Sequence, residues 1–161
     1  MVEKCSFSVG NLIDNKYNVV KHLGEGSFGL VYLVEDSRGK KYALKMLKFW
    51  EVPPQIREKL EQRFEMEYQT GLIDSPYLVR SHGRGRVSGN PYILMEFCPK
   101  GDLNKASNLS DFNLTSRQVL LGLKALHNNG KVHRDLKPEN VLVKEDRSRS
   151  EERFSRNAET D

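Results

Sequence analysis

Alternating apolar and polar positions predict five β-strands in the first part of the chain. The segments "YNVVKHL" and "GLVYLVED" are rich in β-branched and aromatic residues, and the glycine-bearing "GEGS" separates them. "DSRGK" predicts a hairpin turn after them, and "RGRVSGN" predicts another turn further along, because glycine and small polar residues favour tight turns. The five expected strands cover residues 17–23, 29–36, 41–47, 77–83 and 90–97.

A helix is expected over residues 55–72, between the third and fourth strands. Apolar residues recur there every four positions, at Ile56, Leu60, Phe64, Tyr68 and Leu72. Two prolines precede this stretch, and proline is tolerated in the first turn of a helix. Glu67 follows Phe64 by three positions and therefore falls on the apolar stripe, whereas Glu65 is directed toward solvent.

A second helix is expected in "LTSRQVLLGLKALHNNG", residues 114–130. Thr115 or Ser116 would cap its start, and Gly130 would end it. Its apolar stripe consists of Val119, Leu120, Leu123 and Leu126. We expect this stripe to need further helices to cover it, because contiguous exposed apolar surface favours association.

The composition changes abruptly at Glu145. Residues 145–161, "EDRSRSEERFSRNAETD", are mostly charged, and Phe154 is their one large apolar residue. Such a segment buries too little surface to offset the entropy of ordering it. We expect a disordered charged tail, whose serines Ser150 and Ser155 follow arginines as in sites of basic-directed kinases.

The overall composition favours a soluble, cytoplasmic protein. The chain has 161 residues and a net charge of only +4, so a nucleic-acid binder with a basic stripe is not expected. Its two cysteines, Cys5 and Cys98, lack the spacing of a metal site or a disulfide framework. Glu3 and Lys4 stand where a signal peptide would need an apolar core, and no apolar run is long enough to span a membrane.

Candidate chemistry begins with "GEGSFGLV", Gly24 to Val31. Three glycines between two strands let backbone amides approach a phosphate with no side chain in the way. A glycine-rich hairpin turn would explain this segment equally well on its own. The next strand contains "YALK", in which Ala43 and Lys45 are two positions apart and share a face. Lys45 could therefore reach phosphates beneath the loop.

Glu67 supplies a possible partner for Lys45. A carboxylate on the buried stripe of a helix needs a cation, because an unpaired buried charge is costly. We therefore expect Lys45 to pair with Glu67 and not with Glu65. A glutamate at the edge of the helix face remains the alternative.

The densest reactive cluster is "HRDLKPEN", residues 133–140. Asp135 can accept a proton from a hydroxyl group, and Lys137 can neutralise a phosphoryl oxygen. The amide oxygen of Asn140 can bind a hard cation such as Mg²⁺. A polar loop after a helix would explain each residue singly, but not all of them at this spacing.

Together these motifs give the chain a clear resemblance to eukaryotic-type protein kinases. "GEGSFGLV" resembles the glycine-rich loop, "YALK" the strand with the ATP-contacting lysine, and "HRDLKPEN" the catalytic loop, in the family's order. Lysine two positions after the catalytic aspartate resembles the serine/threonine class. The resemblance implies an α+β fold, in which a small lobe of five antiparallel strands and one helix precedes the first helix and catalytic loop of an incomplete helical large lobe.

The resemblance also implies ATP and Mg²⁺ as cofactors and a protein as substrate. Asp135 would be the catalytic base, Lys137 would contact the transferred phosphoryl group, and Asn140 would hold a magnesium ion. "MEFCPKGD" resembles the hinge, with Met95 as gatekeeper. The residues implied to bind ATP are Leu23, Gly24, Gly26, Gly29, Val31, Ala43, Lys45, Glu67, Met95, Glu96, Cys98, Asp102 and Leu142.

The kinase pattern stops before a D-F-G motif, which does not occur after Asn140. We therefore expect an N-terminal extension (1–16), a partial kinase domain (17–144) and the charged tail (145–161). Within the partial domain, residues 17–97 would form the small lobe and 98–144 the hinge and the start of the large lobe. A gene-model artefact, a splice form or a genuine short protein would each account for a kinase pattern that stops before D-F-G. We expect the chain by itself to be inactive. The alternative function is a non-catalytic fragment that binds nucleotide weakly or binds a partner.

Overall fold

The computed structural model describes residues 1–105, 112–144, 152–154 and 159–160. The chain divides into two compact units. The first unit comprises residues 1–64 and 81–97, and the second comprises residues 65–80 and 98–161. Each unit is described separately below.

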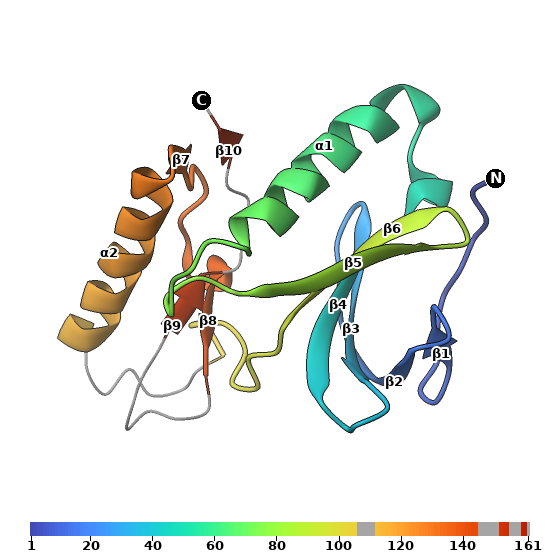
Figure 1. Cartoon of the computed structure of the whole chain (residues 1–161), viewed down its shortest axis with the longest axis horizontal. Helices are drawn as coiled ribbons and strands as arrows, with labels where there is room; N and C mark the ends of the chain where they lie inside the picture. Colours follow the sequence, from blue (N-terminus) through green and yellow to red (C-terminus); the bar gives the residue numbers. More distant parts are fainter. Residues whose placement is uncertain (106–111, 145–151, 155–158, 161) are drawn as a thin grey trace. The chain divides into compact units, whose positions relative to one another are not determined.

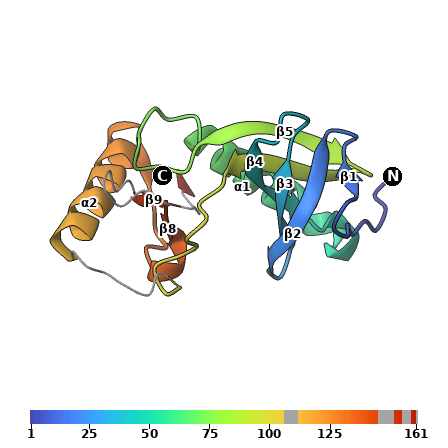
Figure 2. The same ribbon diagram turned by 90° about the horizontal axis from the view of Figure 1, so that it is seen from below.

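The first unit is built on a six-stranded antiparallel sheet (Figures 1 and 2). The strand order is β1-β2-β3-β4-β6-β5, and every neighbouring pair is antiparallel. The strands are β1 (Leu12–Ile13), β2 (Tyr17–Glu25), β3 (Gly29–Glu35), β4 (Lys41–Leu47), β5 (Ser81–Val87) and β6 (Asn90–Glu96). Four of the five expected strands are confirmed close to their expected bounds, the one expected over 77–83 is shifted along the chain, and β1 adds a sixth strand at the edge of the sheet.

The position of β5 differs from the prediction. We expected a strand over 77–83 and a turn over 84–90, but the strand begins at Ser81 and the turn consists of Ser88 and Gly89. Both turn residues have positive φ, 48° and 78°, as a type I′ two-residue hairpin turn requires. The apolar residues that suggested an earlier strand, Leu78 and Val79, are buried outside any strand.

One face of the sheet carries the hydrophobic core of the first unit. Alternate residues of the central strands are almost completely buried there, because successive strand side chains point to opposite faces. The core residues are Ile13, Val19, Leu30, Tyr32, Val34, Tyr42, Leu44, Met46, Tyr92 and Leu94. The opposite face carries four of the candidate nucleotide-binding residues, Val31, Ala43, Lys45 and Met95.

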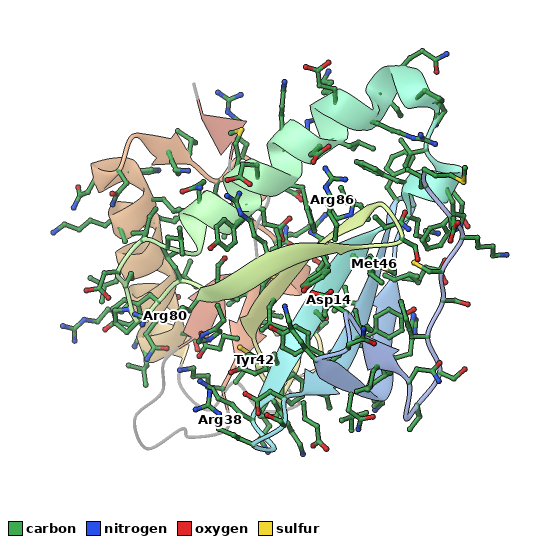
Figure 3. All side chains as sticks on the ribbon, turned by 45° about the vertical axis from the view of Figure 1, so that its right-hand side comes forward. Asp14, Arg38, Tyr42, Met46, Arg80 and Arg86 are labelled. Atoms are coloured by element: carbon green, nitrogen blue, oxygen red, sulfur yellow. The ribbon has the colours of Figure 1, made fainter. Side chains whose placement is uncertain are left out.

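The N-terminal residues pack against this core. Cys5 and Phe7 contact the buried cluster. Asp14, labelled in Figure 3, accepts a hydrogen bond of 2.6 Å from the hydroxyl of Tyr92. Opposite Tyr92 on β5 stands Gly85, where a Cβ atom would lie 2.5 Å from the Tyr92 hydroxyl oxygen. Glycine at this position therefore makes room for the tyrosine ring.

Helix α1 (Pro54–Thr70) follows the 3₁₀ helix η1 (Phe49–Glu51); it begins one residue before the predicted start and ends two residues before the predicted end. The predicted stripe is only partly correct, because Phe64 is buried while Ile56 and Leu72 are exposed. A spacing of four residues moves about 40° around the helix at each step, so Ile56 lies about 80° around the helix from Phe64, and Leu72 lies beyond the end of the helix at Thr70. Arg86 of β5, labelled in Figure 3, forms an ion pair with Glu61 of α1.

Helix α2 (Phe112–Asn128) is the main element of the second unit. It begins before Thr115 and Ser116, so the predicted cap at either residue is wrong. Leu126 is fully buried with Leu78 and Val141, and a set of partly buried residues surrounds them: Ile73, Leu103, Val119, Leu123 and Ala125.

The predicted stripe of α2 is therefore largely covered by residues of the same unit. Leu120 was wrongly assigned to it and remains 65% exposed. It lies about 100° around the helix from Val119, which is enough to turn its side chain away from the buried cluster.

The other elements of the second unit are short and lie before, within and after the segment 133–140. They are β7 (Lys131–Val132), the 3₁₀ helix η2 (Pro138–Asn140), β8 (Val141–Val143), β9 (Glu152–Phe154) and β10 (Glu159–Thr160). Strand β8 pairs with β9, and β7 with β10. The last two strands fall within the expected tail, most of which lies outside the described residues, and its disorder stays a prediction. No helix among the described residues has the length and apolar character to cross a bilayer.

Candidate functional site

The glycine-rich segment forms the hairpin between β2 and β3. Gly24 pairs with Val31, and the amide of Gly26 donates a hydrogen bond of 2.8 Å to the carbonyl of Gly29. None of these three glycines has a positive φ. A Cβ atom built on Gly24 or Gly26 would meet no other atom within 4 Å. The fold itself therefore does not require glycine at these two positions.

The sheet face opposite the core brings together several predicted ATP-binding residues of the first unit. Val31 pairs with Lys45, and Ala43 pairs with Met95, across neighbouring strands. All four side chains are half-buried. The prediction that Ala43 and Lys45 share a face is confirmed, because Leu44 between them is fully buried in the core.

Two further residues of this face were not identified from the sequence. Leu33 pairs with Ala43, and Ile93 pairs with Lys45. Both are nearly fully buried, although they alternate with the core residues of their strands. Both residues lie within apolar runs, so the sequence does not show which face of the sheet they occupy. The register of the sheet assigns them to this face. Leu23 lies at an irregularity of β2, between His22 and Gly24, and is half-buried.

The surroundings of Lys45 and Glu67 agree with part of the prediction. The amine of Lys45 lies 5.8 Å from the centre of the Phe64 ring, within the range of a cation–π contact. Glu67, three residues after Phe64, is only 7% exposed, so its place on the buried side of the helix is confirmed. Glu65 accepts a hydrogen bond of 2.7 Å from Gln69. The pairing of Lys45 with Glu67 stays a prediction.

The predicted hinge begins at the end of β6, where Met95 and Glu96 are half-buried. Cys98 is buried, and its carbonyl accepts a hydrogen bond of 3.1 Å from the amide of Gly101. Further on, Asp102 and Leu142 form a β-bridge.

Hydrogen bonds on both sides of this bridge hold it in place. The amide of Leu103 donates to the carbonyl of Val141 at 3.0 Å, and the amide of Val143 donates to Gly101 at 2.8 Å. Asp102 and Leu142, distant in the sequence, are thus neighbours in the second unit.

The three predicted catalytic residues also lie together in the second unit. The Lys137 amine is 3.1 Å from Oδ2 of Asp135, and the Asn140 amide nitrogen donates to the same oxygen at 3.1 Å. The Asn140 side chain also donates to the main-chain carbonyl of Asp135 at 2.8 Å. A cation and an amide thus hold one carboxylate, and η2 fixes their spacing because Asn140 N donates to Lys137 O.

The turn before Asp135 is tight and anchored by a buried histidine. The amide of Asp135 donates to the carbonyl of His133 at 2.8 Å and approaches its Nδ1 at 3.3 Å. His133 is only 2% exposed. Arg134, between them, has φ of +55°, which is uncommon for a residue other than glycine and typical of functional sites. No role was predicted for His133 from the sequence, and its burial identifies it as the anchor of this loop.

The donor atoms of the second unit fit a magnesium ion only in part. Both side-chain hydrogen bonds of Asn140 use its nitrogen, which orients the amide oxygen as the atom that could bind a cation. Among the described residues, no three His, Cys, Asp or Glu side chains are grouped to hold a metal. Magnesium commonly retains several waters and uses one or two carboxylates together with substrate phosphates. A site completed by nucleotide phosphates is therefore the arrangement that these residues allow.

Comparison with known proteins gives a consistent result. The profile of the family described as "Protein kinase domain" matches residues 17–150. Protein kinase PINOID 2 of Arabidopsis thaliana is 32% identical over 139 residues, which cover 81% of this chain and 26% of the relative. Ribosomal protein S6 kinase alpha-6 of Danio rerio is 34% identical over 143 residues, covering 81% of this chain and 19% of the relative. The chain thus spans about a quarter or less of the length of these relatives.

Proposed function

The chain belongs to the protein kinase domain family, and from this premise we propose that it is a serine/threonine kinase sequence that binds Mg·ATP. The γ-phosphate of ATP would be transferred to a hydroxyl group of a protein substrate. Cytoplasmic location is part of the same proposal. The observation that carries it is the convergence of the Lys137 amine and the Asn140 amide nitrogen on one oxygen, Oδ2, of the Asp135 carboxylate.

Nucleotide binding would use the sheet face opposite the core in the first unit. Gly24, Gly26 and Gly29 would cover the phosphates with backbone amides, and Lys45 would contact the α- and β-phosphates. The open space around Gly24 and Gly26 supports this, because the fold gives no reason to exclude a side chain there. Leu23, Val31 and Ala43 would contact the adenine base.

The hinge and its continuation would complete nucleotide recognition. Glu96 and Cys98 would offer backbone groups to adenine, with Met95 as gatekeeper. Leu142 would contact the base and Asp102 the ribose. The β-bridge between Asp102 and Leu142 supports this assignment, because it makes neighbours of two residues proposed to contact adjoining parts of the nucleotide.

Each catalytic residue would have a distinct part in phosphotransfer. Asp135 would accept the proton of the substrate hydroxyl, a contribution that is commonly worth about 10²–10⁴ in rate. Lys137 would neutralise charge on the transferred phosphoryl group. Asn140 would hold Mg²⁺ through its amide oxygen, and the ion would supply neutralisation of charge on the phosphates.

A second candidate function rests on a specific observation, the absence of D-F-G after Asn140. In protein kinases the aspartate of that motif holds the metal ions against the phosphates. Residues 1–161 by themselves would then act as a non-catalytic module that binds nucleotide weakly or binds a partner. We expect no phosphotransfer from these residues alone.

A labelled-ATP assay on purified residues 1–161 with a generic serine/threonine substrate tests this choice. The matched control is the double variant Lys45→Ala, Asp135→Asn, which removes the proposed phosphate contact and the base. Equal background in both proteins is the expected result and favours the non-catalytic module. Turnover that disappears in the double variant would establish the chain as an active kinase by itself.

A further inference from the structure

A lysine outside the predicted site holds the glycine-rich loop. Lys48 is 5% exposed, and it directly follows β4, three residues after Lys45. A lysine is almost never so deeply buried unless its charge is paired. The partners of Lys48 therefore identify its role.

Lys48 contacts the loop through both its side chain and its backbone. Its amine lies 2.7 Å from Oε1 of Glu25, the residue between the first two glycines of the motif. Its backbone amide donates a hydrogen bond of 2.8 Å to the carbonyl of Phe28, on the other side of the same hairpin. One residue thus holds the loop at two points that flank Gly26.

A second carboxylate fixes the lysine itself. Glu51, in η1, lies 2.7 Å from the Lys48 amine. The hydrogen bonds to Glu25 and then Glu51 raise the pKa of Lys48, and Lys48 in turn lowers the pKa of Glu51. Both carboxylates are about half exposed, so the buried partner of this three-residue network is the cation.

From these contacts we infer that Lys48 is a positioning residue that holds the glycine-rich loop in its nucleotide-binding shape. A loop with three glycines loses much conformational entropy when it becomes ordered. Fixing it before the nucleotide arrives lowers that cost and increases affinity. This inference rests on the proposed function, in which the loop covers the phosphates.

The test compares hydrogen exchange with nucleotide binding in the full 161-residue chain. Exchange of the Gly26 amide, measured by NMR, reports the loop, and the Gly39 amide, which donates to Asp36 in another hairpin, serves as an internal control. The variants are Lys48→Met, which removes the cation, and Glu25→Gln, which removes its loop partner at an exposed site where unfolding is not expected.

Both variants should accelerate exchange at Gly26 about threefold or more without changing Gly39, because local opening is affected and global stability is not. The dissociation constant for Mg·ATP, measured by calorimetric titration, should increase about fivefold, a typical coupling between two sites. Lys48→Arg keeps a cation with several hydrogen-bond donors, so its Gly26 exchange rate and its dissociation constant for Mg·ATP should be close to those of the parent chain. Lys16→Met, which removes an exposed lysine of the same unit, should change neither.

Unchanged exchange at Gly26 in both variants, or equal acceleration at Gly39, would overturn the inference. Faster exchange at Gly26 with an unchanged dissociation constant would likewise refute a positioning role in binding. If the parent chain binds no Mg·ATP, the proposed function fails, while exchange at Gly26 still decides whether Lys48 holds the loop.

Discussion

Replacing Gly26 with alanine separates the requirements of the fold from those of nucleotide binding. Its backbone is outside the left-handed region, and an added Cβ would meet no atom within 4 Å. A glycine-to-alanine change at such a position stabilises a protein by about 0.4–1 kcal/mol, because the unfolded chain loses conformational freedom. For a chain of this size, that corresponds to a rise in Tm of roughly 1–4 °C.

The same methyl group should weaken nucleotide binding. It would stand where the proposed function places phosphate oxygens against the backbone of the loop. A hydrogen bond to a charged group contributes about 1.5–3 kcal/mol, so losing one backbone contact should weaken Mg·ATP binding about tenfold or more. Gly26→Ala is therefore expected to be slightly more stable than the parent chain and a poorer nucleotide binder.

Two measurements on each protein provide the test, namely urea unfolding followed by circular dichroism and calorimetric titration with Mg·ATP. Gly83→Ala is the matched control, because its Cβ would make only an ordinary contact at 3.9 Å with Leu94 outside the glycine-rich loop. It should leave nucleotide affinity unchanged. A destabilised Gly26→Ala variant, or one with the affinity of the parent, would refute the reasoning.

Three further predictions concern single side chains. Burial is the main cause that raises the pKa of Tyr92 above its unfolded value of about 10, and the hydrogen bond to the Asp14 carboxylate is the next. The neutral Tyr92 hydroxyl therefore stabilises the folded state fully below about pH 10, and this stabilisation is lost as the pH rises further. Urea unfolding of Tyr92→Phe should show a smaller loss of stability between about pH 9 and 11 than the parent, and identical slopes would count against this. Leu126→Ala should lower the free energy of unfolding in urea by about 2–5 kcal/mol, because Leu126 is fully buried. Leu120→Ala, at an exposed position, should change it by less than about 0.5 kcal/mol, and similar losses in the two variants would contradict the assigned helix face. Glu67→Gln should weaken Mg·ATP binding in titrations while Glu65→Gln does not, and the reverse order would refute the predicted pairing.

The central strands of the sheet could be predicted because their alternation is strong. The segment 41–47 was assigned to its observed bounds, since the large apolar residues Tyr42, Leu44 and Met46 alternate with Lys41, Ala43 and Lys45 along it. The strand at 81–87 was misplaced because its exposed positions carry His82, Arg84 and Arg86, and two of its inward positions are glycines. Its register depends on the turn at Ser88 and Gly89, and the sequence located this turn only within the seven residues 84–90.

The sequence predicted those parts of the candidate site that lie close together in the chain, and not those that tertiary packing brings together. Asp135, Lys137 and Asn140 lie within one short segment, so a local motif was sufficient to bring them together. Glu25 and Lys48 are separated by 23 positions in the chain, and only the pairing of β3 with its neighbours places them together. The sequence provides no periodic signal for a contact of this kind. The same reason applies to His133, whose burial depends on tertiary packing.

Titration of residues 1–161 with Mg·ATP, alongside Lys45→Ala and Lys41→Ala, tests the central claim most directly. Lys41 is an exposed lysine on the same strand and serves as the matched control for loss of a positive charge. We expect saturable binding to one site, weakened about tenfold or more by Lys45→Ala because a charged contact to phosphate is lost, and unchanged by Lys41→Ala. Absence of binding to the parent chain, or equal affinity in the parent and Lys45→Ala, would contradict the assignment of this sheet face as a kinase nucleotide site.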